Sequence, residues 1–110
     1  MPYRFVRARP IEDRLPELQE RLDEGEIEQM DPFGQAMTRS LTEARLDPKT
    51  DEAVWVEEDY CTPPLAMERE AVLDDYFEHL TVIDEDVSEP AGWERIEDLP
   101  SLWERVPERS

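Results

Sequence analysis

The chain has 110 residues, of which 30 are Asp or Glu and 12 are Lys or Arg, giving a formal net charge of −18 at pH 7. This length suits a single domain with one hydrophobic core. A surface with this much negative charge repels nucleic acid and anionic membranes, so we expect neither as a partner. No apolar run approaches the ~18 residues of a membrane span, and no signal-peptide core opens the chain. We therefore expect a soluble, cytoplasmic protein.

The acidity has two competing explanations. Lys49 is the only lysine, and the carboxylates are spread along the whole chain. This pattern is typical of a halophile-type cytosolic protein, because salt at roughly 1 M screens charge repulsion within about 3 Å. The alternative is an acidic mimic of nucleic acid that inhibits a basic protein by occupying its cleft. A mimic would line its carboxylates along one face, so their even spread favours salt adaptation.

The N-terminal third predicts one strand followed by one helix. Residues Tyr3 to Arg9 alternate between two faces, as a short strand does. Apolar residues then recur at helical spacing from Ile11 to Leu22, with Pro16 in the first turn, where proline is tolerated. We expect this helix to begin at Asp13 and to end at Gly25, before a turn-rich connection.

The middle of the chain predicts a β-hairpin. Its strands are expected at Ala36 to Leu46 and at Ala53 to Tyr60, joined by a turn at residues 47–51. The first strand would carry small residues on one face. Its other face would carry Met37, Arg39, Leu41, Glu43 and Arg45.

An amphipathic helix and a short strand are predicted next. Thr62 is a plausible cap, and the two prolines after it suit a first helical turn. The apolar stripe of this helix runs from Leu65 to Leu80. The strand is expected at Leu80 to Asp84, before an acidic linker at Glu85 to Glu89.

The order strand, helix, strand, strand, helix, strand predicts a ferredoxin-like βαββαβ sandwich over residues 1–89, of the α+β class. Its four-stranded antiparallel sheet would have two helices on one face and leave the other face open. Residues 90–110 would form a C-terminal helical tail carrying Trp93 and Trp103. We expect the tail to cover the open face of this chain or of a second subunit.

Two residues are weak catalytic candidates. Cys61, the only cysteine, precedes a helix start, whose dipole lowers a thiol pKa, but three nearby carboxylates act in the opposite sense. A small buried residue at a tight corner is the plainer explanation, and we prefer it. His79, the only histidine, could act as a general acid or base, or could simply suit a helix C-terminus. A small enzyme using either residue in a pocket is therefore an alternative function.

No metal or cofactor is expected. The chain has only three glycines and no phosphate-binding loop, and its histidine and cysteine do not follow zinc-site spacing. Carboxylates near Asp84 and Asp86 lack the spacing of an EF-hand loop, so we interpret them as solvated acids.

Arginines on the predicted strands suggest a binding or association surface. An open sheet face with an apolar floor and a cationic rim would suit another subunit or a small anionic ligand; pairing with the surplus carboxylates is the plainer explanation. The candidate interface residues are Tyr3, Phe5, Met37, Arg39, Leu41, Arg45, Trp55, Trp93 and Trp103. The sequence thus favours an association module, expected as a homodimer, or a small-ligand-binding module.

Overall fold

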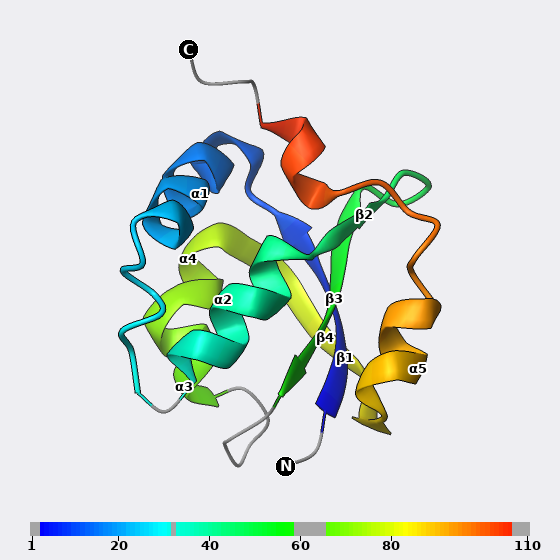
Figure 1. Cartoon of the computed structure of the whole chain (residues 1–110). Helices are drawn as coiled ribbons and strands as arrows, with labels where there is room; N and C mark the ends of the chain where they lie inside the picture. Colours follow the sequence, from blue (N-terminus) through cyan, green and yellow to red (C-terminus); the bar gives the residue numbers. More distant parts are fainter. Residues whose placement is uncertain (1–2, 32, 59–65, 107–110) are drawn as a thin grey trace.

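A four-stranded antiparallel sheet forms the centre of an α+β fold (Figure 1). The computed structural model describes residues 3–31, 33–58 and 66–106. The sheet order is β2-β3-β1-β4, so that β2 and β4 form its edges. The strands are β1 (Tyr3–Pro10), β2 (Arg45–Asp47), β3 (Glu52–Glu58) and β4 (Phe77–Val87).

Strand β1 follows the alternation predicted from the sequence. Val6 and Ala8 are fully buried and belong to the larger core cluster, whereas Phe5 belongs to a second, smaller cluster. Because Phe5 lies opposite Val56 in the β1–β3 pairing, the smaller cluster occupies one face of the sheet. The sheet is therefore apolar on both faces at its centre.

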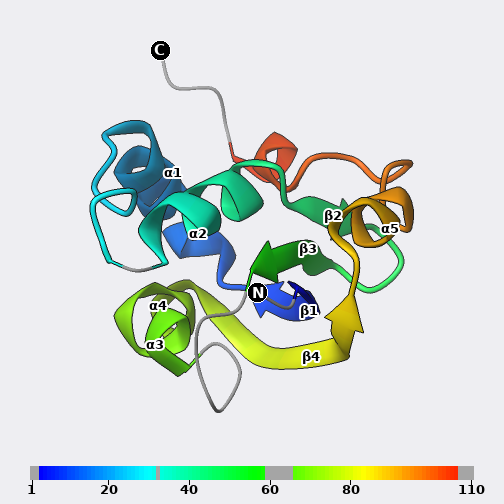
Figure 2. The same ribbon diagram turned by 60° about the horizontal axis from the view of Figure 1, so that its bottom comes forward.

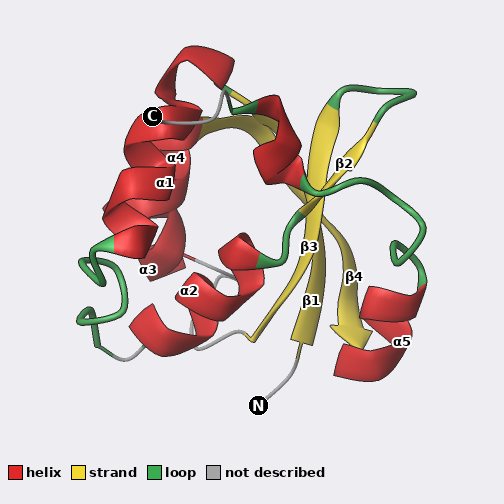
Figure 3. Cartoon of the chain, turned by 45° about the horizontal axis from the view of Figure 1, so that its top comes forward, coloured by secondary structure: helices red, strands yellow, loops and turns green. Residues whose placement is uncertain are grey.

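The larger core lies between the sheet and a layer of helices (Figure 3). This layer contains 3-10 turn Glu12–Arg14, α1 (Leu15–Asp23), α2 (Gly34–Thr42), α3 (Ala66–Glu68), π turn Arg69–Leu73 and α4 (Asp74–Tyr76). The first helix lies where it was predicted, with Pro16 in its opening turn, but it begins at Leu15 rather than at Asp13, which lies in the 3-10 turn before it. Gly25 has a φ of 75°, a conformation that suits glycine just beyond a helix end.

The predicted strand Ala36–Leu46 is wrong: most of it is helix α2. Phe33, Met37 and Leu41 recur every four residues and are all buried, which is the stripe of a helix packed on one side. The alternating small residues obscured this stripe in the sequence. Only Arg45–Asp47 of this stretch is a strand. The predicted hairpin is therefore present, but its first strand is short.

The helix predicted to reach Leu80 ends at Tyr76, and β4 begins at Phe77. Phe77 has an extended backbone and pairs with Pro10 of β1. Its ring packs on Trp55, with 5.0 Å between the ring centroids. Burial against the sheet therefore ends the helix one turn early. The junction that contains Cys61 and Thr62 lies outside the described residues.

The C-terminal segment packs on the opposite face of the chain's own sheet (Figure 2). Helix α5 (Glu89–Glu94) is capped by the Ser88 side chain, which accepts a hydrogen bond from the backbone N–H of Ala91 at 3.3 Å. Its Gly92 lies so close to β3 that an added Cβ would be 2.5 Å from Cγ2 of Val56. The smaller core contains Phe5, Val54, Val56 and Ile96.

A second contact fixes the end of this segment beside β2. The backbone N–H of Leu102 donates to the carbonyl oxygen of Ala44 at 2.9 Å, and that of Leu46 donates to Pro100 at 2.8 Å. Ser101 and Glu104 form a capping box at the start of the 3-10 helix Leu102–Arg105. The segment thus runs from one sheet face to the β2 edge, and encloses a hollow between α2 and α5.

Candidate functional site

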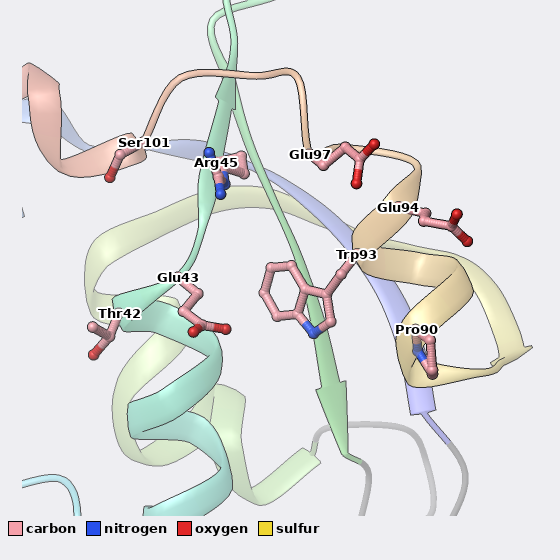
Figure 4. Close-up of a pocket in the computed structure, with 8 residues that line it drawn as sticks. All are labelled: Thr42, Glu43, Arg45, Pro90, Trp93, Glu94, Glu97 and Ser101. Carbon is pink, nitrogen blue, oxygen red and sulfur yellow. The ribbon is translucent and has the colours of Figure 1, made fainter.

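A hollow lies between the C-terminal end of α2, strand β2 and helix α5 (Figure 4). Its volume is about 450 Å³, within the usual range of small-ligand sites. Three separate parts of the chain meet here, because the segment after α5 returns to pair with β2. The lining residues are Thr42, Glu43, Arg45, Pro90, Trp93, Glu94, Glu97 and Ser101.

Trp93 forms the apolar wall of the hollow. Its indole projects from α5 toward Glu43 (Figure 4). The side chain is partly buried and packs against both core clusters, which hold the indole in place on the side away from the hollow. The indole therefore presents a held aromatic surface rather than a freely rotating one.

Carboxylates surround this aromatic surface. Glu43 and Glu97 lie on opposite sides of the indole, with Glu94 farther out on α5 (Figure 4). All three side chains are exposed. Within the part of the chain that the structure describes, none of the three forms a side-chain hydrogen bond or an ion pair. Their charges are therefore available to a ligand.

The one arginine in the hollow is already engaged. Arg45 donates a hydrogen bond from Nη1 to the carbonyl oxygen of Leu99 at 2.8 Å. This contact helps to hold the segment after α5 against β2, in line with the Arg45–Ser101 bridge. Three carboxylates against one guanidinium leave the hollow anionic. Its chemistry suits a positively charged group with an apolar body.

A second hollow, of about 460 Å³, lies over Tyr76 between α1 and α4. The Tyr76 hydroxyl donates to Glu17 at 2.7 Å and accepts from Arg21 at 3.0 Å. Arg14 donates to Glu17 at 2.9 Å, and Arg21 forms an ion pair with Glu26 at 3.2 Å. Most of the charged side chains named here are thus paired with one another.

The same network explains two pKa shifts. Burial, and then the hydrogen bond to Glu17, raise the pKa of the Tyr76 hydroxyl. The hydrogen bond from Tyr76, and then that from Arg14, lower the pKa of Glu17. Tyr76 is therefore neutral and Glu17 ionised over the ordinary pH range, as a structural contact requires.

The predicted arginine-rimmed face does not assemble as expected. Arg7 lies on the α5 side of the sheet, where its Nη1 donates to Asp47, Thr50 and Glu52, each at 3.1 Å. Arg39 lies on helix α2 rather than on a strand. Pairing with carboxylates, the plainer explanation, therefore holds for Arg7.

The predicted interface residues also separate. Met37 and Leu41 project from α2 into the larger core, and Trp55 lies there on β3, so all three are fully buried within one chain. Trp103 donates its indole N–H to the carbonyl oxygen of Leu41 at 2.8 Å. Of the nine residues proposed, Arg45 and Trp93 line the hollow described above.

Tyr3 and Phe5 pack in the smaller core on the face covered by α5 and the residues after it. The guanidinium of Arg95 lies 4.4 Å above the Phe5 ring. This part of the predicted open face is therefore covered within one chain. Homodimerisation stays a prediction.

Of the two catalytic candidates, the structure describes only His79. His79 is exposed on β4 with a φ of 53°, and it lines none of the hollows described here. Cys61 lies outside the described residues, so an enzymatic role for either residue stays a prediction. Asp84 forms an ion pair with Arg95. Among the described residues, no group of three or more acidic, histidine or cysteine side chains is placed to hold a metal.

The sequence interpretation missed the carboxylates around Trp93. The signal was present, since Glu94 follows Trp93 directly and Glu97 lies one helical turn further. Glu43, however, could not be assigned to this site while residues 36–46 were predicted as a strand. Its place depends on α2 ending beside β2.

Comparison with protein-family models, with curated proteins and with solved structures finds no match for this chain. No helix in the described ranges is both long enough and apolar enough to cross a membrane. The fold and the hollow therefore define the class only as an α+β protein with an anionic aromatic hollow.

Proposed function

We propose that this chain is a binding module whose site is the Trp93 hollow and whose ligand carries an ammonium or guanidinium group. The observation that carries the proposal is the held indole of Trp93 with the uncommitted carboxylates of Glu43 and Glu97 on either side. A cation suits this hollow better than the anionic ligand expected from the sequence, because three carboxylates line it and its one arginine is bonded to Leu99.

The chemistry of the hollow supports a cation in two ways. A positive charge over an indole face gains about 0.5 to 2 kcal/mol, and tryptophan is the best aromatic partner. Carboxylates add charge-assisted hydrogen bonds, which are stronger than neutral ones. A ligand with a positive charge and hydrogen-bond donors uses the Trp93 indole and the Glu43 carboxylate together. A simple metal ion or an apolar molecule does not.

The test is calorimetric titration of the whole chain with tetramethylammonium and with arginine ethyl ester. We expect both to bind, and Trp93→Leu to weaken binding about tenfold, since it removes the aromatic face. Trp103→Phe is the matched control, because Trp103 is outside the hollow. Equal binding by wild type and Trp93→Leu would contradict the proposal.

We further propose that the fold is a ferredoxin-like βαββαβ arrangement with an added C-terminal segment. The sheet order β2-β3-β1-β4 with three antiparallel pairings supports it. The helices between β1 and β2 and between β3 and β4, all on one face, support it as well. An experimental structure with a different strand order would contradict it.

A further inference from the structure

The Trp93 hollow is one end of a longer groove along the outer side of α2. A smaller hollow, of about 190 Å³, shares Glu43 and Trp93 with it. A third, of about 380 Å³, shares Arg39 with the second. The shared residues place the three hollows in one line, which we call the α2 groove.

The α2 groove has the dimensions of an extended segment rather than of one small molecule. Helix α2 has nine residues, which at 1.5 Å per residue is about 13 Å. The groove spans this length, from Ala36 near its first turn to Glu43 just after its end, and continues to Glu97. An extended chain rises about 3.3 Å per residue, so four or more residues fit.

Acidic side chains dominate the α2 groove. Six glutamates contribute to its lining against two arginines. One of the arginines is held by the Leu99 carbonyl oxygen, and one of the glutamates, Glu58, is hydrogen-bonded to Tyr3. The acids occur at both ends, whereas Arg39 lies between them. The glutamates are Glu28, Glu43, Glu58, Glu89, Glu94 and Glu97.

We infer that the partner is an extended basic segment of another protein, bound with one cationic side chain over Trp93. This inference rests on the proposed cation site and extends it along α2. Charge complementarity identifies the partner, since an anionic segment would meet carboxylates at both ends. Arg39 adds a register rule: the residue that passes it is not basic, because like charges repel.

The part of β3 that extends beyond its pairing with β2 does not take part as a pairing strand. Trp55, Val56 and Glu57 are at most 1% exposed, so their backbone groups are covered. The segment therefore binds through side chains in the α2 groove, and not by adding a strand to the sheet.

The test uses capped hexapeptides with alternating lysine and serine, titrated into the whole chain beside tetramethylammonium. We expect the peptide to bind about tenfold more tightly than tetramethylammonium, since each further exposed ion pair adds up to about fivefold. Glu28→Gln, at the end distant from Trp93, should weaken the peptide about two- to fivefold and leave tetramethylammonium unchanged. Glu70→Gln is the matched control, exposed and outside the groove.

A second variant tests the register rule directly. Arg39→Gln should tighten binding of an all-lysine hexapeptide about two- to fivefold, because it removes the repelling charge. Its effect on the alternating peptide should be smaller.

The outcomes separate the two proposals. If tetramethylammonium binds at Trp93 but the peptide binds no more tightly, or if Glu28→Gln and Glu70→Gln act equally on the peptide, the basic-segment partner is wrong and the cation site stands. If neither probe depends on Trp93, the proposed function itself fails.

Discussion

The two hollows of this protein are nearly equal in volume but opposite in how they use charge. That over Tyr76 measures about 460 Å³ and that beside Trp93 about 450 Å³. In the first, Glu17, Arg21 and the Tyr76 hydroxyl are bound to one another. In the second, Glu43 and Glu97 have no such partner among the described side chains.

This difference separates a structural contact from a binding surface. The hydrogen-bond network around Tyr76 joins α1 to α4, and its polar groups already have partners, so few remain to bind a ligand. Carboxylates beside the partly exposed ring of Trp93 offer charge and apolar area together. An acidic composition alone could not distinguish the two, since both hollows contain several glutamates.

The largest expected effect comes from moving α5. Gly92→Ala places a methyl group 2.5 Å from Val56 Cγ2, so the helix must shift. We expect a loss of about 1 to 3 kcal/mol in unfolding free energy by urea denaturation, and loss of cation binding at Trp93. Ala91→Ser, an exposed change on the same helix, is the control. Adding Val56→Ala should recover part of the loss, and no recovery would rule out this contact as the cause.

Removing the Tyr76 hydroxyl should affect stability alone. Tyr76→Phe deletes the hydrogen bonds to Glu17 and from Arg21, so we expect a loss of about 1 to 2 kcal/mol in urea denaturation. Affinity for tetramethylammonium should not change. A weaker cation affinity in this variant would show that the two hollows are coupled and would break the comparison.

The pH dependence of the Tyr76 network has a defined sign. The pKa of Glu17 is lowered below its ordinary value of 4.5 by Tyr76 and Arg14. Its contribution to stability is therefore complete above pH 4.5 and is lost as the pH falls through the lowered pKa. The difference in melting temperature between wild type and Glu17→Gln should shrink below about pH 4.5.

The control for this measurement lies in the same hollow. Glu24→Gln removes an equal charge from it without breaking a side-chain hydrogen bond. Its difference from wild type should vary less with pH. A Glu17→Gln difference that stays constant down to about pH 3 would contradict the assigned contact.

The smallest expected effect distinguishes the hollows by a single charge. Glu97→Gln should weaken tetramethylammonium binding about two- to fivefold at low salt and less at about 0.5 M salt, since the pair is exposed and screened. Glu17→Gln should leave it unchanged. Equal weakening by both variants would mean that overall charge, and not the Trp93 hollow, attracts the cation.

The sequence predicted the sheet better than the site. Periodicity identified β1, the first helix and most of β3, because one face of each is buried and leaves a clear pattern. A four-stranded antiparallel sheet in an α+β fold is confirmed. Residues 36–46 misled the prediction, since small residues at alternate positions resemble a strand whether or not a helix forms.

The site depended on tertiary contacts that no local pattern carries. Trp93 was predicted as an interface residue, but its neighbours Glu43 and Arg45 join it only because the C-terminal segment returns to β2. Trp55 was grouped with it on aromatic character alone, and instead packs beneath the helices on Phe77. The type of a residue thus indicated what it could bind, whereas the tertiary fold determined whether it lies in the hollow or in the core.

The most direct test follows the three tryptophan indole N–H signals by ¹⁵N–¹H NMR while tetramethylammonium is added. Trp55 donates to Glu57 in the core, Trp103 donates to Leu41, and Trp93 lines the hollow. We predict that the Trp93 signal shifts with saturation while the signals of the other two stay in place. Equal shifts of all three signals, or no shift of Trp93, would contradict a cation site in this hollow.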